Sequence, residues 1–473
     1  MKKIYPLAVA LLMTGAAQAQ WQPNMRLTNS IGNANTHANS NRCLAVNGNE
    51  VHAVWQDARN GNLDIFYKRS LNGGLTWEAD VALITNSEFQ ATPAIAVSGS
   101  NVHIVWEDDR DGGSEVYYAR STDAGATWST EVKISNEGFN IGTPSIAVEG
   151  NNVHVVWMET SSMFVEDVYH ISSTDGGLTW GDEHKLSGQD SDEEQPTVAV
   201  SGNNIHVAWA DNRFYSGADW NREIYYIRST DGGATWGTEV RVSNNDEESE
   251  FPAIAATGVN VHIAWQDDRT GVMQVFTRSS TDNGSTWGLE AQVTNDAIVP
   301  AQLPSIAANG SDVHLAWVSL NMTNISNDIY YAKSTNAGAV FGAREDVTNH
   351  EGSSTNPHVA VSGTRVHVLW QDDREVAGEP YDIEVYYTNN ENTSSVESIG
   401  ASSFIVFPVP ANNKLIVSGD VTTNETYDVI DNLGRVVLQG KLSANEIDVT
   451  TLTDGFYMIR IGSATKPFAI QHK

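Results

Sequence analysis

Five copies of the phrase Trp-x-Asp-x-Arg place a carboxylate and a guanidinium two residues apart. Their arginines are Arg59, Arg110, Arg213, Arg269 and Arg374. A guanidinium can hold the carboxylate of a ligand through two parallel hydrogen bonds. The same Asp and Arg can also pair with each other and fasten the hairpin on which they stand. Because the pair recurs, we favour the fastening role and keep ligand binding by a ring of guanidinium groups as the alternative.

Seven histidines also recur at equivalent positions, namely His52, His103, His154, His206, His262, His314 and His367. An imidazole could ligate a metal or transfer a proton. A reaction centre breaks the symmetry of a repeat, however, whereas a residue present in every copy makes the same packing or hydrogen-bonding contact each time. We therefore predict a structural role for these histidines.

Both sets belong to one long repeat, which must provide the elements that position them. The phrase Val-His-x-x-Trp, with Ile for Val in one copy, ends at residues spaced 51 to 56 apart: Trp55, Trp106, Trp157, Trp209, Trp265, Trp317 and Trp370. Each copy has the length of a four-stranded propeller blade. The second copy contains short alternating or apolar runs at 93–97, 102–106, 115–120 and 131–134, and helical periodicity is nearly absent. The sequence predicts an all-β, seven-bladed β-propeller over residues 20–388, with blades 1 to 7 numbered along the chain.

A propeller must join its first and last blades, because otherwise two sheet edges stay unpaired. Blade 7 has candidate strands at 358–361, 366–370 and 383–387 but none after them. Residues 21–28 match the phrase at 236–243, which forms the fourth strand of blade 4, and they precede the first strand of blade 1. We predict that residues 21–28 supply the missing fourth strand of blade 7.

The phrase Ser-x-Asp-x-Gly-x-Thr-Trp lies between the third and fourth strands, and its intact copies contain Asp123, Asp175, Asp231 and Asp282. A short Asp side chain can accept hydrogen bonds from the amides of its own turn, Gly can adopt a positive φ, and we expect the Trp to cover the base of that hairpin. The phrases resemble the Asp boxes, or BNR repeats, of sialidase-like propellers, over most of residues 21–388. The resemblance implies a structural role for the four Asp residues, because in that family the boxes lie away from the active site.

The catalytic residues of sialidases find no counterpart in this sequence. Sialidases have six blades and an Arg-Ile-Pro segment, whereas this chain has seven repeats, and Leu27 and Thr28 follow Arg26. No Tyr and Glu pair stands out from the repeat, and the His and Tyr chemistry of seven-bladed polysaccharide lyases cannot be placed either. The sequence therefore assigns no catalytic residue.

The loops between the second and third strands are longest in blades 4 and 7. They carry Phe214, Tyr215, Trp220 and Tyr381. Aromatic faces beside Asp and Arg are typical of a sugar site, although a small apolar cluster among the loops explains them equally well. Acidic residues within 190–194 and 246–250 make calcium a weak option, but no defined calcium-binding loop is present, so we assign no metal ligand and no cofactor.

The two ends of the chain predict export. Residues 1–19 combine two lysines, a short apolar run and a small-residue end, as a secretory signal peptide does. After a linker predicted at 389–403, residues 404–473 resemble the type A C-terminal sorting domain of the type IX secretion system, although Val409 stands where that family usually has Asn. The segments that carry the resemblance are 407–411, 427–435, 452–457 and the terminal Lys473. It implies a small β-sandwich, passage across the outer membrane by the type IX secretion machinery, and release or surface attachment.

Charge and cysteine content exclude several classes of protein. The chain has 59 acidic and 27 basic residues, and its net charge of -32 repels nucleic acid and anionic lipid. No stretch after the signal peptide reaches the length of an apolar membrane helix. Cys43 is the single cysteine, so no intrachain disulfide forms, and we expect its thiol to be buried.

Together these features predict a secreted or surface-attached propeller that recognises an extracellular glycan. The alternatives are a glycoside hydrolase of sialidase type, which leaves the enzymatic status open, and a structural adhesion protein.

Overall fold

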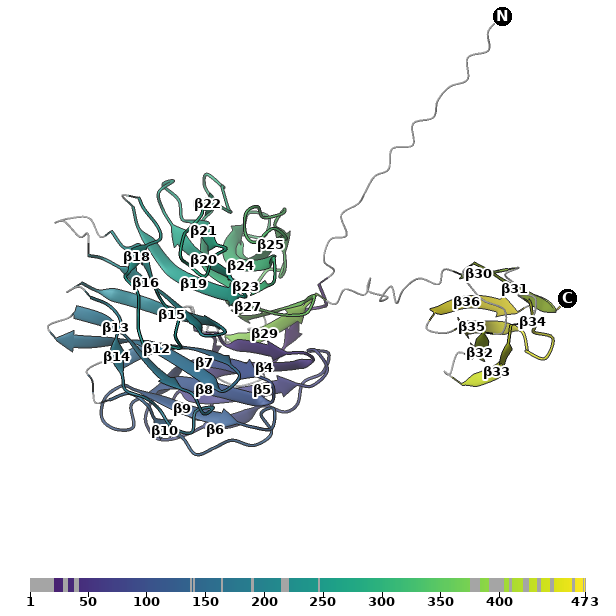
Figure 1. Ribbon diagram of the computed structural model, residues 1–473, viewed down its shortest axis with the longest axis horizontal. Coiled ribbons are helices and arrows are strands. Elements are labelled where there is room, and N and C mark those ends of the chain that lie inside the picture. Colours follow the sequence, from purple (N-terminus) through teal and green to yellow (C-terminus); the bar gives the residue numbers. More distant parts are fainter. Residues whose placement is uncertain are drawn as a thin grey trace, which may run out of the picture. The chain divides into compact units, whose positions relative to one another are not determined.

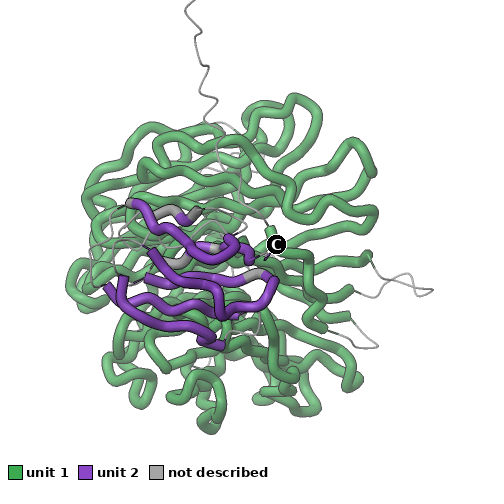
Figure 2. The backbone as a smooth tube through the Cα atoms, turned by 90° about the vertical axis from the view of Figure 1, so that its right-hand side faces the viewer, with its two compact units in different colours: residues 1–391 green, residues 392–473 purple. Residues whose placement is uncertain are grey.

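The computed structural model consists of strands and their connections (Figure 1). It describes residues 21–28, 33–37, 42–136, 138, 141–162, 165–188, 191–213, 221–245, 247–374 and 383–390, and then 404–407, 411–419, 425–431, 435–442, 446–461, 464–470 and 472. The chain divides into two compact units, Met1–Glu391 and Asn392–Lys473, which Figure 2 colours separately. Within the described residues, no helix is long and apolar enough to cross a membrane.

Seven antiparallel sheets make up the first unit, and each has four positions from the centre of the ring outward. The first strands are β3 (Leu44–Asn47) with the short β2 (Ala34–Asn35), β7 (Gln90–Ser98), β11 (Ile141–Glu149), β15 (Glu193–Ser201), β19 (Ser249–Thr257), β23 (Ala301–Asn309) and β27 (Ser354–Ser362). The second strands are β4 (Glu50–Asp57), β8 (Asn101–Asp108), β12 (Asn152–Ser162), β16 (Asn204–Asp211), β20 (Asn260–Asp267), β24 (Asp312–Asn321) and β28 (Arg365–Asp372). The third strands are β5 (Asp64–Ser70), β9 (Glu115–Ser121), β13 (Val165–Ser173), β17 (Glu223–Ser229), β21 (Gln274–Ser280), β25 (Ser326–Ser334) and β29 (Glu384–Asn389). The fourth strands are β6 (Val81–Ile84), β10 (Val132–Lys133), β14 (His184–Lys185), β18 (Val240–Arg241), β22 (Ala291–Gln292), β26 (Glu345–Asp346) and β1 (Met25–Arg26).

The first strands of neighbouring blades contact one another around the whole ring, including β27 of blade 7 against β3 of blade 1. Each blade buries the Trp of its second strand almost completely, as Trp106 and Trp265 illustrate. The prediction of an all-β, seven-bladed propeller is confirmed.

The ring closes through the N-terminal strand. Met25 pairs with Tyr387 and Arg26 with Tyr386, so β1 is the fourth strand of blade 7, as predicted. Arg26 and Thr28 both hydrogen-bond the carboxylate of Glu384, and Arg26 forms an ion pair with it.

The propeller also extends beyond its predicted end at residue 388. Asn389 belongs to β29, and the backbone N of Asn390 donates to the carbonyl of Val366 at 3.0 Å. These two asparagines were predicted to begin the linker. Their amide side chains explain the difference, because that of Asn390 accepts a hydrogen bond from the Val366 N–H and so caps the sheet.

The Asp box is a self-contained turn, as blade 2 illustrates. Asp123 Oδ1 accepts hydrogen bonds from Ser121 Oγ at 2.7 Å and from the Thr127 amide at 2.8 Å, while Oδ2 accepts from Thr127 Oγ1 at 2.7 Å. These hydrogen bonds, of which the one from the Thr127 amide has the largest effect, lower the pKa of Asp123 to about 2. Asp175, Asp231 and Asp282 accept equivalent hydrogen bonds, so each carboxylate serves its own turn.

The box also joins neighbouring blades. Trp128 of blade 2 lies edge-on to Tyr67 of blade 1, with ring centroids 5.0 Å apart, and Trp77 of blade 1 meets Tyr387 of blade 7 in the same way at 4.9 Å. The Trp of the box therefore contacts a buried third-strand tyrosine of the preceding blade. Gly125 has φ +80°, and a Cβ there would lie 1.9 Å from Tyr67 Oη.

The second unit has its own core. Its described strands form one sheet of β30 (Phe404–Phe407), β31 (Lys414–Gly419) and β34 (Glu446–Asp448), and another of β33 (Val436–Lys441), β32 (Thr426–Ile430), β35 (Gly455–Ile461) and β36 (Ala464–Ile470). Leu415, Val417, Val429, Ile459 and Phe468 from both sheets pack together. This arrangement is the small β-sandwich that was predicted.

Deletion of residues 21–28 is expected to lower the melting temperature by roughly 10 °C or more, because it leaves an edge of β29 unpaired and breaks the ring. Thermal unfolding followed by circular dichroism measures the effect. Deletion of residues 392–473 is the control, because this segment contributes no described strand to the seven sheets. Equal melting temperatures for the intact chain and the 21–28 deletion would contradict the closure.

Replacement of Gly125 by Ala is expected to cost roughly 2–4 kcal/mol of unfolding free energy. The backbone at this position has a positive φ, which an alanine rarely adopts, and the new methyl group would overlap Tyr67 Oη. Gly99→Ala in the same blade is the matched control, since Gly99 has φ +57° with no atom within 4 Å of the added Cβ, and about 1 kcal/mol is expected there. Denaturant titration compares the two. Adding Tyr67→Phe removes the overlapping oxygen, so it is expected to recover part of the stability lost in the Gly125→Ala variant and none in the Gly99→Ala variant.

Candidate functional site

The candidate site lies at the loop face of the propeller. We define this face by the hairpins between second and third strands, such as 109–114 and 268–273, and by the loops from each fourth strand to the next first strand, such as 134–140 and 242–248. The Asp boxes lie at the opposite end of the strands, because they connect third and fourth strands.

The recurrent arginines on the loop face pair within their own blades. Arg110 bonds both carboxylate oxygens of Asp108, through Nε at 2.8 Å and Nη2 at 2.6 Å, and its guanidinium lies 4.4 Å from the ring centroid of Tyr117. Trp106 Nε1 donates to the same carboxylate at 2.8 Å, and Glu131 binds the other side of the guanidinium. The hairpin is thus held by a chain from Trp to Asp to Arg to Glu.

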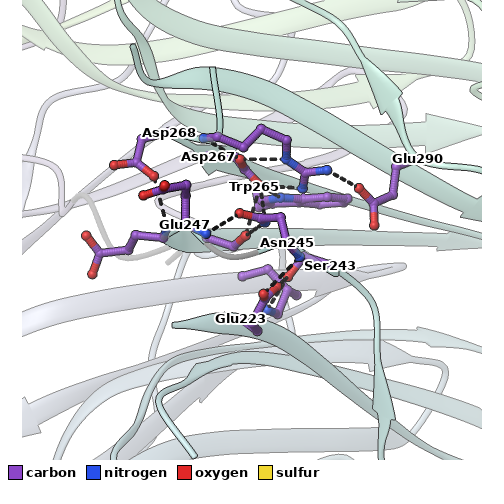
Figure 3. Close-up of polar contacts among 12 residues, drawn as sticks. Glu223, Ser243, Asn245, Glu247, Trp265, Asp267, Asp268 and Glu290 are labelled. Atoms are coloured by element: carbon purple, nitrogen blue, oxygen red, sulfur yellow. Dashed lines mark hydrogen bonds and ion pairs between the residues drawn. The ribbon is translucent and has the colours of Figure 1, made fainter. Parts of the chain in front are cut away.

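The other four arginines repeat the pairing with Asp, and three of them also pair with a second acidic residue. The ion pairs are Arg59 with Asp57 and Asp80, Arg213 with Asp211 and Glu239, Arg269 with Asp267 and Glu290, and Arg374 with Asp372. Figure 3 shows Trp265, Asp267 and Glu290 of the blade 5 set. Of the two roles that the sequence left open, this geometry matches the fastening one, because each guanidinium already has a carboxylate partner.

The same carboxylates link neighbouring blades. Asn245, in the loop from blade 4 to blade 5, donates its amide N–H to Glu223 at 3.0 Å and its side-chain Nδ2 to Asp267 at 3.1 Å (Figure 3). In blade 7, His350 Nε2 lies 3.0 Å from Asp372. The loops of this face are therefore tied to a rigid frame.

The seven second-strand histidines are buried inside the blades. Each Nδ1 forms a hydrogen bond with a third-strand side chain, at 2.6 to 3.2 Å: the partners in chain order are Tyr67, Tyr118, His170, Tyr226, Ser279, Tyr331 and Tyr387. Burial lowers the pKa of six of them to about 4 and that of His367 to about 3. Neutral, buried imidazoles with fixed partners have the structural role that was predicted.

Phe214, Tyr215, Trp220 and Tyr381, the aromatic residues that the sequence singled out, lie outside the described residues, as do residues 1–20 of the expected signal peptide. Cys43 is buried, its Sγ lies 3.4 Å from the carbonyl of Pro93, and burial raises the pKa of its thiol to about 12.

A cluster that sequence reasoning missed lies where blades 3, 4 and 5 meet. Arg222 forms ion pairs with Glu194 of blade 4 at 2.7 Å and with Glu248 and Glu250 at the edge of blade 5 at 2.9 and 3.2 Å. Glu166 of blade 3 interacts electrostatically with Arg222 and Glu194. We call these five residues the Arg222 cluster.

The Arg222 cluster is negative and only partly buried. The exposed fraction of each side chain in its ion pairs is 15 to 26 %. Burial, and then the neighbouring carboxylates, raise the pKa of Glu166 and of Glu250 to about 7. Four carboxyl groups and one guanidinium therefore offer many hydrogen-bond acceptors, two of which can exchange protons near neutral pH.

The signal for this cluster was a break in the repeat. Arg222 precedes the third strand of blade 4, and the equivalent residues in the other blades are Leu63, Ser114, Glu166, Met273, Asn327 and Ile383. Only blades 3 and 4 carry a charge at this position, and the charges are opposite. Glu194, Glu248 and Glu250 belong to the acidic loops that had suggested calcium, but here they bind a guanidinium. Among the described residues, no three His, Cys, Asp or Glu side chains are arranged to hold a metal ion.

Residues 405–472 match the family of secretion system C-terminal sorting domains. Such a domain directs export through the type IX secretion machinery, so the protein is secreted or attached to the outer-membrane surface. No curated protein sequence matches the chain.

Solved structures similar to this chain include carbohydrate-active enzymes. A polysaccharide lyase has a TM-score of 0.55 and 11% identity, covering 78% of this chain and 98% of its own. A PL25 ulvan lyase has a TM-score of 0.53 and 12% identity, covering 79% of this chain and 96% of its own. A Hadza microbial sialidase has a TM-score of 0.44 and 13% identity, covering 72% of this chain and 74% of its own. At this identity the two lyases establish the fold alone.

Stability is expected to fall as the pH falls from about 6.5 to about 4. The unfolded chain protonates its imidazoles near pH 6.5, whereas burial delays protonation in the folded protein to about pH 4. Between these values the unfolded state binds more protons, so acid favours unfolding. Burial lowers the pKa of His37 and His170 as well, which makes nine such histidines. It raises the pKa of Glu159, Glu166 and Glu250 to about 7 and that of Glu193 to about 9, and it also raises the pKa of Glu107, Glu223, Asp268 and Asp346, whose shifts are smaller. These eight carboxyl groups act in the opposite direction but do not cancel the nine histidines.

Melting temperatures measured from pH 7 to pH 4.5 test this expectation. His103→Gln removes one of the buried imidazoles and is expected to flatten the slope of melting temperature against pH. His184→Gln, at an exposed imidazole, is the control and is expected to keep the wild-type slope. A steeper slope for the His103 variant would refute the assignment.

Proposed function

We propose that the propeller binds a glycan outside the cell at the Arg222 cluster on its loop face. The observation that carries the proposal is a single guanidinium held by three carboxylates of two adjacent blades, at the place where the repeat loses its symmetry. A set of charges used only for fastening would recur from blade to blade, as the Asp and Arg pairs do.

The chemistry of the cluster suits sugar hydroxyl groups. The ion pairs hold Glu194, Glu248 and Glu250 in place, so that their remaining acceptor positions are oriented before a ligand arrives. Neighbouring hydroxyl groups of a sugar ring can donate to such carboxylates. A few convergent polar groups of this kind fix the orientation of a ligand in a typical binding site.

The charge of the cluster favours a neutral or amino-bearing sugar. Four carboxyl groups surround one guanidinium, and the whole chain carries a net charge of -32, so an anionic sugar would be repelled. To bind the carboxylate of a sialic acid, the site would need a basic side chain without an acidic partner. The five hairpin arginines are each paired with an Asp within the chain. We therefore expect sialosides to bind more weakly than neutral glycans.

Aromatic residues of the loop in blade 4 would complete such a site. The segment with Phe214, Tyr215 and Trp220 begins after Arg213 and ends two residues before Arg222. We propose that one of these rings stacks on the sugar, because the apolar face of a sugar ring packs well against an aromatic ring. Tyr381, which follows Arg374 in the sequence of blade 7, is proposed as a further ligand contact.

Glycoside hydrolysis is the second candidate. The raised pKa of Glu166 and Glu250, about 7 for each, favours it, because a carboxyl group that remains protonated near neutral pH can protonate a leaving oxygen.

Glycan binding is tested with an array of neutral, amino-bearing and acidic glycans, followed by calorimetry on the best ligand. Arg222→Met and the double variant Glu194→Gln with Glu250→Gln are each expected to weaken binding by about tenfold or more. Glu78→Gln is the matched control, because it removes a carboxylate paired with Arg69 beside the Asp box of blade 1 and is expected to leave affinity unchanged.

Melting curves establish that each variant is folded before affinities are compared. Wild-type affinity in both cluster variants would contradict the proposal, as would binding restricted to acidic glycans. Turnover of the bound glycan that is lost in Glu166→Gln or Glu250→Gln would establish the hydrolase instead.

A further inference from the structure

The seven first strands surround a cavity of about 190 Å³ at the centre of the ring. Every blade contributes apolar side chains to its wall, among them Leu44, Ala96, Val148, Ala256 and Ala308. Among the described residues that line it, Arg42 alone is charged.

Arg42 reaches across the ring from blade 1. Its guanidinium Nη2 donates to the carbonyl of Ile254 in blade 5, and its own carbonyl accepts the amide of Ile95 in blade 2 at 2.8 Å. Within the described residues no carboxylate forms an ion pair with Arg42, in contrast to the hairpin arginines. Burial accordingly lowers the pKa of Arg42, with no acidic group to offset it.

The surrounding sequence offers no counter-charge either. None of the 59 acidic residues of the chain precedes Glu50. The segments 29–32 and 38–41, which are outside the described residues, read Asn-Ser-Ile-Gly and Ala-Asn-Ser-Asn and carry no charge. Burial lowers the pKa of His37 to about 4, so this neighbour in the chain is neutral at pH 7.

A partly buried cation that has no ion-pair partner has lost hydration at a cost that an accompanying anion offsets. We propose that the channel binds a monovalent anion of about the size of chloride against the Arg42 guanidinium. One negative charge neutralises Arg42, whereas a divalent anion would leave a net negative charge in the cavity.

Backbone amides can complete the anion site. Each first strand pairs with a second strand on one side only, so its other edge borders the channel and carries N–H groups. Some of these N–H groups already have acceptors: Ile95 N donates to the backbone carbonyl of Arg42, and Val359 N donates to Ser305 Oγ at 3.0 Å. The site is distinct from the Arg222 cluster, and its anion would link blades 1 and 5 across the axis.

The full chain tests the proposal in sodium bromide and sodium gluconate at equal ionic strength. At a bromide concentration ten times its dissociation constant, the melting temperature of the wild type is expected to be roughly 2 °C higher than in gluconate. The Arg42→Met variant, which lacks the cation, is expected to show no such rise. Arg120→Met is the matched control, because Arg120 donates to a carbonyl of the next blade, that of Gly176 at 2.7 Å, and we expect it to keep the wild-type response.

Anomalous diffraction from wild-type crystals grown in bromide gives an independent measurement should the Arg42 variant fail to fold. A bromide peak within hydrogen-bonding distance of the Arg42 guanidinium supports the proposal. An empty channel in those crystals, or the same bromide response in wild type and the Arg42 variant, overturns it.

Discussion

The contact on which the ring depends is the one that a third-strand tyrosine makes between two blades. Tyr67 Oη lies 2.7 Å from His52 Nδ1 of its own blade and occupies the space that a side chain at Gly125 of the next blade would need. The edge of Trp128 packs on the same ring. Histidine, tyrosine, glycine and tryptophan are therefore parts of one seam, and a substitution at any of them acts on two blades.

The seam also explains how the ring tolerates variation. Blade 3 has His170 in place of tyrosine, and this imidazole bonds His154 and meets Trp236 of blade 4 edge-on. The last seam uses Trp77 against Tyr387, so the first and last blades are joined by the same edge-on contact. Blade 5 has Thr277 at the tyrosine position, and its histidine bonds Ser279 instead. Because the seams hold the Asp-box end of the ring, the loop face can change its charges without loss of the fold.

That freedom is visible where blades 3, 4 and 5 meet. The hairpin arginines pair with the Asp two residues before them in five blades, whereas Glu166 and Arg222 occupy one repeat position with opposite charges. A uniform frame with one locally irregular face is compatible with the binding role proposed above. Export through the type IX secretion machinery, which the C-terminal domain directs, places this face outside the cell.

The sequence by itself determined the number of blades, the closing strand at 21–28, the Asp-box turns and the C-terminal sorting domain. Each depends on a pattern that recurs along the chain or on hydrogen bonds within a few residues, and such patterns can be read without coordinates. Only the tertiary structure decided that Arg110 also pairs with Glu131, that Trp128 packs on the preceding blade, and that Arg222 gathers three glutamates. Those contacts join residues of different strands or blades, and Arg42 meets Ile254 across 212 residues of chain. Their partners are chosen by the curvature of the closed ring, which no local pattern encodes.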